Sequence, residues 1–174
     1  FEMAQTRDVD DLRKVMRFYD YIELQPLANY QYLIDRDQVI DQERLKEILR
    51  GIIDMADELG KPIVATSDAH YVHPNQKRIR DIYINSQAIG GVRHPPYLYN
   101  QEKRHKSHAP DQHLRTTQEM LDAFSWVGDR AYEFVVTNTH RIADQIETIY
   151  PIKDKLYPPD IEGSDQKLRD ICYE

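Results

Sequence analysis

Cysteine is nearly absent from this sequence: Cys172 is the single one among 174 residues, so no disulfide can form within the chain. Chains without disulfides are typical of the reducing cytoplasm, and we expect a cytoplasmic location. Long apolar runs are absent as well, because no stretch approaches the ~20 consecutive apolar residues that cross a bilayer. The sequence therefore excludes a disulfide-stabilised fold and predicts no role in a membrane.

Positive charge is also in short supply. The chain has 23 Lys and Arg against 30 Asp and Glu, which gives a formal net charge of −7. A surface with this excess of negative charge does not, as a whole, attract a nucleic-acid backbone. Binding to nucleic acid therefore requires a local basic patch or another part of a longer protein. We expect the longer protein, because the chain starts at Phe1 and "SDQKLRDICYE" reads as a helix that begins at Ser164 and is cut off.

The sequence does contain two short strand patterns, each followed by helical spacing. Residues 21–24 ("YIEL") predict one strand, and residues 62–66 ("PIVAT") predict a second strand that is buried on both faces. Between them, residues 42–59 carry an apolar stripe at three-and-four spacing, with Asp41 placed to cap the helix and Gly60 to end it. This order of strand, helix, strand and helix is typical of a parallel sheet or barrel.

Apolar periodicity predicts four more helices. In the second of these, over residues 75–87, we expect the core-facing side chains to be Ile79, Ile82 and Tyr83, followed by Ile89. After it, residues 90–115 contain Gly-Gly and Pro-Pro pairs and the basic run "KRHKSH", which predicts a long surface loop. The four helices are 8–18, 75–87, one that starts at Thr116 or Thr117, and 130–149 after Gly128.

The strongest chemical signal follows the second strand, where "SDAH" places Asp68 and His70 just beyond the strand end. In parallel α/β folds, residues beyond the carboxyl ends of the strands form the active face. A carboxylate oxygen and a neutral imidazole nitrogen are ligands that suit zinc, manganese or iron. The spacing is equally compatible with a structural role, in which Asp68 caps a turn and His70 is its hydrogen-bonded neighbour.

Other candidate residues are sparse. Glu23 and Gln25 lie at the end of the first strand segment and are expected to reach the same face as pocket-lining residues. A metal site needs three or four protein ligands, and no HxH, HxxxH or CxxC motif supplies them. Either the site holds no metal, or its other ligands precede Phe1. Surface or packing roles are expected for His94, His105, His108, His113, His140 and Cys172.

Four motifs in order carry a family resemblance: "YDYIELQP" (19–26), "ATSDAHYVHPNQK" (65–77), "HLRTTQEML" (113–121) and "KDKLYPPDIEG" (153–163). They resemble the polymerase and histidinol phosphatase (PHP) domain of PolC-type bacterial DNA polymerase III alpha subunits, which belong to polymerase family C. The resemblance covers essentially the whole chain.

The resemblance implies an α/β fold. The chain would be the part of a distorted (β/α)7 PHP barrel that follows an inserted exonuclease domain, with a helical C-terminal extension leading toward the polymerase palm. Residues 1–115 would be the C-terminal part of the barrel, 116–149 a helical segment that completes it or packs on it, and 150–174 a linker and the start of the palm region. An opened barrel leaves sheet edges unpaired, so we expect self-association or a partner with the missing strands.

The resemblance also implies Asp68 and His70 as metal ligands, with the family's other ligands lying upstream. The parent enzyme would be a DNA polymerase that extends a primer on a DNA template with magnesium, which this chain would not bind. The chain itself would be a scaffold or vestigial phosphoesterase that holds zinc or manganese. Implied partners are DNA, deoxynucleoside triphosphates, the remaining PHP, exonuclease and palm segments, and replisome subunits such as the sliding clamp.

Two other classes of protein are alternatives for this chain. A free-standing metallophosphoesterase of the histidinol-phosphatase kind would require an HxH motif, which the sequence lacks. A non-catalytic interaction module is the other. Bound zinc or manganese with release of phosphate from a monoester would favour the former, and a stable chain without metal the latter.

Overall fold

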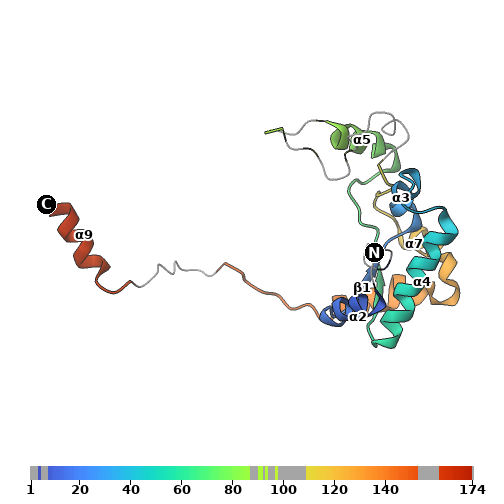
Figure 1. Cartoon of the computed structure of the whole chain (residues 1–174), viewed down its shortest axis with the longest axis horizontal. Coiled ribbons are helices and arrows are strands. Elements are labelled where there is room, and N and C mark those ends of the chain that lie inside the picture. The colour runs from blue at the N-terminus through green and yellow to red at the C-terminus, as the bar shows by residue number, and fades with distance from the viewer. Residues whose placement is uncertain are drawn as a thin grey trace.

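A computed structural model describes residues 4, 8–86, 90, 91, 93, 97, 109–152 and 161–173 of the chain (Figure 1). The elements follow one another in the order α2, β1, η1, α3, α4, β2, η2, α5, α7, η3, η4, α8 and α9. Within these described residues, no helix is both long and apolar enough to cross a membrane. The described part of the chain is a mixed α/β structure.

Two short strands form a parallel sheet, as the sequence predicts. β1 (Ile22–Leu24) pairs with β2 (Ile63–Ala65), with Glu23 opposite Val64. The helix α4 (Gln42–Glu58) lies between them in the chain, as in a βαβ unit. All three residues of β2 are buried, in agreement with its apolar sequence.

The helix α4 supplies the centre of the core. Its start is fixed by Asp41, whose carboxylate accepts a hydrogen bond from the backbone N–H of Arg44 at 2.8 Å. After its end, Gly60 adopts a φ of 65°, which glycine reaches at no steric cost. The predicted cap and stop are therefore confirmed. The buried residues of α4 are Leu45, Ile48, Leu49, Ile52, Ile53, Met55 and Ala56.

The helix α2 (Val9–Phe18) packs on this core through Met16, which is 3% exposed. Asp8 caps its start, where its carboxylate accepts a hydrogen bond from the Asp10 N–H. Arg13 donates two hydrogen bonds to the Glu58 carboxylate, at 2.9 and 3.0 Å. These bonds fasten α2 to the C-terminal end of α4.

The predicted helix after residue 115 is also present. α7 (Thr117–Ala123) begins with a capping box, in which Thr116 Oγ1 accepts from the Glu119 N–H at 3.3 Å and the Glu119 carboxylate accepts from the Thr116 N–H at 2.7 Å. Phe124, at its end, is fully buried. Gly128, with a φ of 65°, then kinks the chain inside the short 3-10 helix η3 (Ser125–Arg130).

The helix predicted over residues 130–149 is interrupted and shorter. A π-helical turn, η4 (Glu133–Thr137), precedes α8 (Asn138–Ala143), and the helix ends there. Beyond it, Ile146 and Ile149 are 74% and 78% exposed. Helices in proteins are held mainly by packing of an apolar face, so a segment without such packing does not continue the helix.

The helix α5 (Lys77–Asn85) faces the opposite way from the prediction. Ile79, Ile82 and Tyr83, expected in the core, are 64%, 63% and 59% exposed. In Figure 1 this helix lies at the top of the view, and α2 lies on the opposite, lower side.

Polar contacts on the other side of α5 explain its orientation. Lys77 Nζ lies 2.7 Å from Asp111 Oδ1, and the Asp81 carboxylate accepts a hydrogen bond from the Ala109 N–H. Ile84 is the buried apolar residue of this helix, at 5% exposure. Apolar periodicity predicts that a helix has an apolar face, but it does not predict whether that face contacts the core or the solvent. Ile89 lies outside the described residues.

The remaining elements are short. η1 (Leu27–Tyr30) and α3 (Gln31–Asp35) connect β1 to α4, and neither was predicted. The 3-10 helix η2 (Pro74–Gln76) precedes α5. α9 (Ser164–Tyr173) begins at the predicted residue, and every residue in it is exposed.

Candidate functional site

The carboxyl ends of β1 and β2 lie side by side because the strands are parallel, and polar side chains gather there. Glu23 on β1 accepts a hydrogen bond from Thr66 Oγ1, just after β2, at 2.6 Å. The side-chain amide of Gln25 lies 3.5 Å from the same carboxylate. The fold thus brings Glu23 of β1 and Gln25, just after it, close to the segment that carries Asp68 and His70.

The amide of Asn29 ties the two strand ends together. Asn29 is 2% exposed, and its Nδ2 donates to the carbonyl of Ser67 at 3.0 Å and lies 3.5 Å from Gln25 Oε1. A buried amide requires such partners because an unpaired polar group in the interior is costly. Nothing in the sequence singles out Asn29, because asparagine is common in turns and no spacing distinguishes this one.

Tyr30 is a second neighbour of this polar cluster. Burial raises the pKa of its phenol to about 12, while a hydrogen bond with the Gln25 backbone acts in the opposite direction. The negative charges of Glu23 and Asp68 contribute to the rise in pKa. Tyr30 therefore stays protonated and neutral at physiological pH.

The backbone at Asp68 is unusual. Its φ is 46°, in the left-handed region that few residues other than glycine adopt. Aspartate and asparagine enter this region more readily than other residues, and residues held there are concentrated at functional sites. The strand therefore ends in a sharp turn that places the Asp68 side chain.

Gln112 holds this turn in place. Its Nε2 donates to Asp68 Oδ2 at 2.6 Å, and its backbone carbonyl accepts the N–H of His70 at 2.8 Å. Gln112 itself is buried, at 8% exposure, whereas the Asp68 and His70 side chains are 36% and 39% exposed. Gln112 could not be predicted from the sequence, because nothing local links it to a turn 44 residues earlier.

Tyr71 adds further hydrogen bonds between the turn at Asp68 and the segment that carries Gln112. Its hydroxyl donates to the carbonyl of Pro110 at 2.9 Å and accepts the N–H of Gln112 at 3.0 Å. Its backbone forms an isolated parallel bridge with His113. The prediction of a surface loop over 90–115 is therefore wrong at its described end, where Ala109 and Gln112 are buried. Interior hydrogen bonds hold that end against the turn.

The Asp68 and His70 side chains face each other, with Oδ1 and Nε2 3.5 Å apart. Two atoms that bind one tetrahedral zinc ion at about 2.0–2.1 Å lie roughly 3.3 Å from each other. The pair therefore fits two positions around one metal ion, both in donor type and in spacing. The same geometry also suits a plain contact within a turn, and the metal assignment stays a prediction.

A complete ligand set is a separate requirement. Among the residues that the structure describes, no group of three or more His, Cys, Asp or Glu side chains could hold a metal ion. His113 takes part in the bridge to Tyr71, and His140 is exposed on α8. Cys172 is an exposed free thiol. The described residues do not include His94, His105 and His108 or the basic run 103–108.

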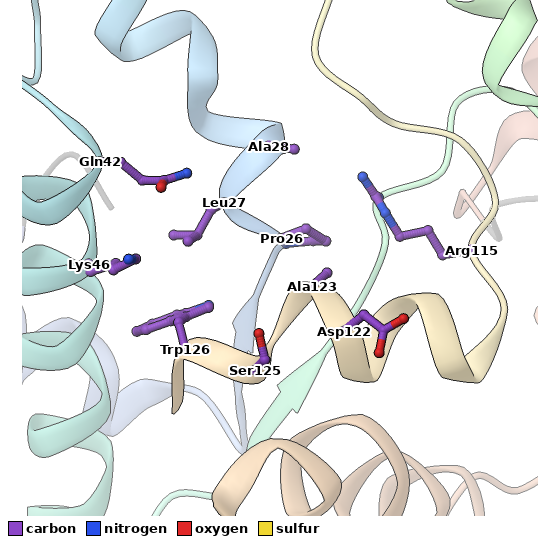
Figure 2. Close-up of a pocket in the computed structure, with 10 residues that line it drawn as sticks. All are labelled: Pro26, Leu27, Ala28, Gln42, Lys46, Arg115, Asp122, Ala123, Ser125 and Trp126. Atoms are coloured by element: carbon purple, nitrogen blue, oxygen red, sulfur yellow. The ribbon is translucent and has the colours of Figure 1, made fainter. Parts of the chain in front are cut away.

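A pocket of about 340 Å³ lies beside this end of β1 (Figure 2). Pro26, Leu27 and Ala28, which follow β1, form one of its walls. Neither Glu23 nor Gln25 belongs to its lining, so their role as pocket-lining residues stays a prediction.

Comparison with known proteins gives one consistent result. No protein-family model matches the chain. It is 45% identical over 174 residues to the DNA polymerase III PolC-type of Halalkalibacterium halodurans and 41% identical to those of Oceanobacillus iheyensis and Bacillus subtilis. These alignments cover 99–100% of the chain and 11% of each relative. The chain thus matches PolC-type DNA polymerase III along its whole length while spanning about a tenth of such a protein.

Proposed function

We propose that the chain is a segment of a PolC-type DNA polymerase III, and that the complete polypeptide extends a primer with deoxynucleotides on a DNA template. The observation that carries this proposal is identity of 38–45% to such polymerases over at least 99% of the chain. Magnesium would serve nucleotidyl transfer at residues outside this chain. The polymerase would act in the cytoplasm.

Within that polymerase, we assign the chain to the PHP part. The parallel pair of β1 and β2 with α4 between them supports a piece of a distorted (β/α)7 barrel. The polar cluster at the carboxyl ends of these strands occupies the place where α/β barrels carry their sites. Residues 1–115 would be barrel, 116–149 a helical segment and 150–174 a linker toward the palm.

Asp68 and His70 would hold a zinc or manganese ion together with ligands from other parts of the polypeptide. When bound, such a metal supplies a Lewis acid and an activated water. Gln112 would orient Asp68 by its hydrogen bond of 2.6 Å. Because two ligands alone do not build a hydrolytic centre, the chain would act as a metal-binding scaffold that is inactive by itself.

The partners follow from the same assignment. DNA and deoxynucleoside triphosphates would be bound by the complete enzyme, which would also contact replisome subunits such as the sliding clamp. Other segments of the polypeptide would cover apolar surface on this chain. The exposed face of α5, formed by Ile79, Ile82 and Tyr83, supports such a contact because three large apolar side chains on one helix face are costly in water.

Primer extension tests the polymerase assignment. The complete polypeptide that contains this chain is incubated with a primed DNA template, deoxynucleoside triphosphates and magnesium, and the isolated chain is assayed in parallel. We expect extension by the former and none by the latter. Extension by the isolated chain, or none by the complete polypeptide, contradicts the proposal.

Elemental analysis tests the metal site. Asp68→Ala and His70→Ala should each lower the zinc or manganese content of the complete polypeptide, because each removes one ligand of the proposed site. His140→Ala removes an exposed histidine on α8 and is the matched control, with unchanged metal content expected. Equal metal content in all variants would leave Asp68 and His70 as residues of a turn. Phosphate release from a monoester would instead favour an active phosphoesterase.

A further inference from the structure

The backbone of β1 has hydrogen-bonding groups on two edges, and β2 uses only one of them. In a parallel pair, successive residues direct their N–H and C=O groups alternately toward the partner strand and away from it. The Ile22 N–H donates to the Pro62 carbonyl at 2.9 Å, and the Leu24 carbonyl accepts the Thr66 N–H at 3.0 Å. Ile22 and Leu24 therefore bond to β2, and the backbone groups of Glu23, between them, point to the opposite edge.

The outer edge of β2 is closed by the chain itself. The same alternation directs the backbone groups of Ile63 and Ala65 away from β1. Asn138 of α8, which is 6% exposed, donates from Nδ2 to the Ile63 carbonyl at 2.8 Å. Both η4 and α8 pack against β2, and all three residues of this strand are buried. A carbonyl that a further strand would use on this edge is thus already bonded.

The outer edge of β1 is open in the part of the chain that the structure describes. Glu23 is exposed, and within that part no third segment donates to or accepts from its backbone. Exposed aromatic side chains precede this edge: Phe18, Tyr19 and Tyr21 are 84%, 52% and 41% exposed. The rings of Phe18 and Tyr19 lie edge to face, with their centroids 5.3 Å apart. Strand addition uses these two components, free main-chain groups for affinity and side-chain contacts for specificity.

We propose that a β-strand from another part of the same polypeptide pairs with β1 at Glu23, and that the sheet grows on this side only. Sheets in globular proteins most often have about four to six strands, so this pair is a small sheet. The chain spans 11% of the relatives that it matches, so such a polypeptide has ample sequence to supply the strand. In the proposed barrel, β2 would be the strand at which the ring stays open. This inference rests on the proposed function, because it takes the chain as a segment of a longer polymerase.

Amide hydrogen exchange, resolved residue by residue, tests the pairing in the complete polypeptide and in the isolated chain. The Glu23 amide should exchange about tenfold or more slowly in the complete polypeptide than in the isolated chain, because it gains a hydrogen bond. The Ala65 amide, on the closed edge, should exchange equally in both. Equal exchange of Glu23 in the two proteins, or slower exchange of Ala65 in the complete one, overturns the proposal. Protection of Glu23 in the isolated chain that falls on dilution also overturns it, because a second copy would then occupy the edge.

Glu23→Pro and Glu23→Ala isolate the backbone donor. Both remove the side-chain bond to Thr66, but only proline removes the N–H. Proline is tolerated on a strand edge whose N–H faces solvent, so in the isolated chain the two variants should show Leu24 amide exchange within about twofold of each other. In the complete polypeptide, exchange of Leu24 should be about tenfold faster with proline than with alanine.

Equal exchange of Leu24 in the two variants of the complete polypeptide overturns the proposal. A tenfold difference already in the isolated chain does so too, because the N–H would then be bonded within it. Should Glu23→Pro fail to fold, the exchange of Glu23 in the natural protein decides. Primer extension is read separately: extension without protection of Glu23 rejects this inference alone, and protection without extension rejects the polymerase assignment alone.

Discussion

The side-chain amide of Gln112 donates a hydrogen bond of 2.6 Å to the carboxylate of Asp68, 44 residues earlier in the chain. The carbonyl of the same glutamine accepts the N–H of His70 at 2.8 Å. One buried residue thus fixes both members of the predicted metal pair, through a side chain in one case and the backbone in the other. Gln112 is a positioning residue of this site.

Gln112→Leu should destabilise the chain, because it removes the buried partner of the Asp68 carboxylate. We expect the free energy of unfolding in urea to fall by about 1–3 kcal/mol. Gln118→Leu is the control: its exposed amide donates to Asp122 at 2.9 Å, and its loss should cost less than about 0.5 kcal/mol. Equal changes in the free energy of unfolding of the two variants would show that the hydrogen bond from Gln112 to Asp68 stabilises the chain no more than an exposed one does.

Tyr30→Phe should alter stability at alkaline pH. Burial raises the pKa of Tyr30 to about 12, so the folded chain holds the phenolic proton more tightly than the unfolded chain, whose tyrosines ionise near 10. The stabilisation is complete below about pH 10 and is lost as the pH rises to about 12.

The measurement is urea unfolding of the natural chain and the Tyr30→Phe variant between neutral and alkaline pH. The natural chain should lose up to about 2 kcal/mol more than the variant over this alkaline range. Tyr132→Phe, at a tyrosine that is 60% exposed, should follow the natural chain. Parallel curves for all three proteins would refute the raised pKa.

Glu133→Gln should alter stability in acid. Arg130 donates to Glu133 at 3.0 Å and to Asp57 of α4 at 2.6 Å, and the hydrogen bond from Arg130 holds the pKa of Glu133 below its usual range. A lowered folded pKa contributes stability that is present above about pH 4.3 and is lost as the pH falls through the folded value.

Because the Glu133 side chain is 42% exposed, solvent screening limits this contribution to less than about 1 kcal/mol. Urea unfolding between pH 3 and pH 7, at about half-unit steps, resolves it. The natural chain should lose more stability than Glu133→Gln at the acid end. An identical pH dependence in the two proteins would argue against the ion pair with Arg130.

Two isoleucines of α5 should respond differently to the same change. Ile82 is 63% exposed and Ile84 is 5% exposed. In the isolated chain, Ile82→Glu should cost less than about 0.5 kcal/mol and Ile84→Glu about 2 kcal/mol or more, measured by amide hydrogen exchange over residues 77–85. In the complete polymerase, where we propose that other segments cover this face, Ile82→Glu should also lose protection. A loss from Ile82→Glu already in the isolated chain would mean that the face is covered within it.

The sequence was a good guide wherever the cause of structure is local. The helix α4, its cap at Asp41 and its stop at Gly60 follow from apolar spacing and from side chains within one turn of each helix end. The two strands follow from short apolar runs, and their parallel pairing follows from the order of elements. The position of Asp68 and His70 after β2 was also readable, because it depends on the strand end alone.

Contacts between distant segments decided the rest. Only the tertiary structure places Gln112 on Asp68, turns the apolar face of α5 outward, and gathers Arg115 and Trp126 around one pocket. These features depend on residues tens of positions apart, and spacing within a single helix or strand carries no information about them. Local propensity thus determined which elements form, whereas packing and buried hydrogen bonds determined which faces and side chains meet.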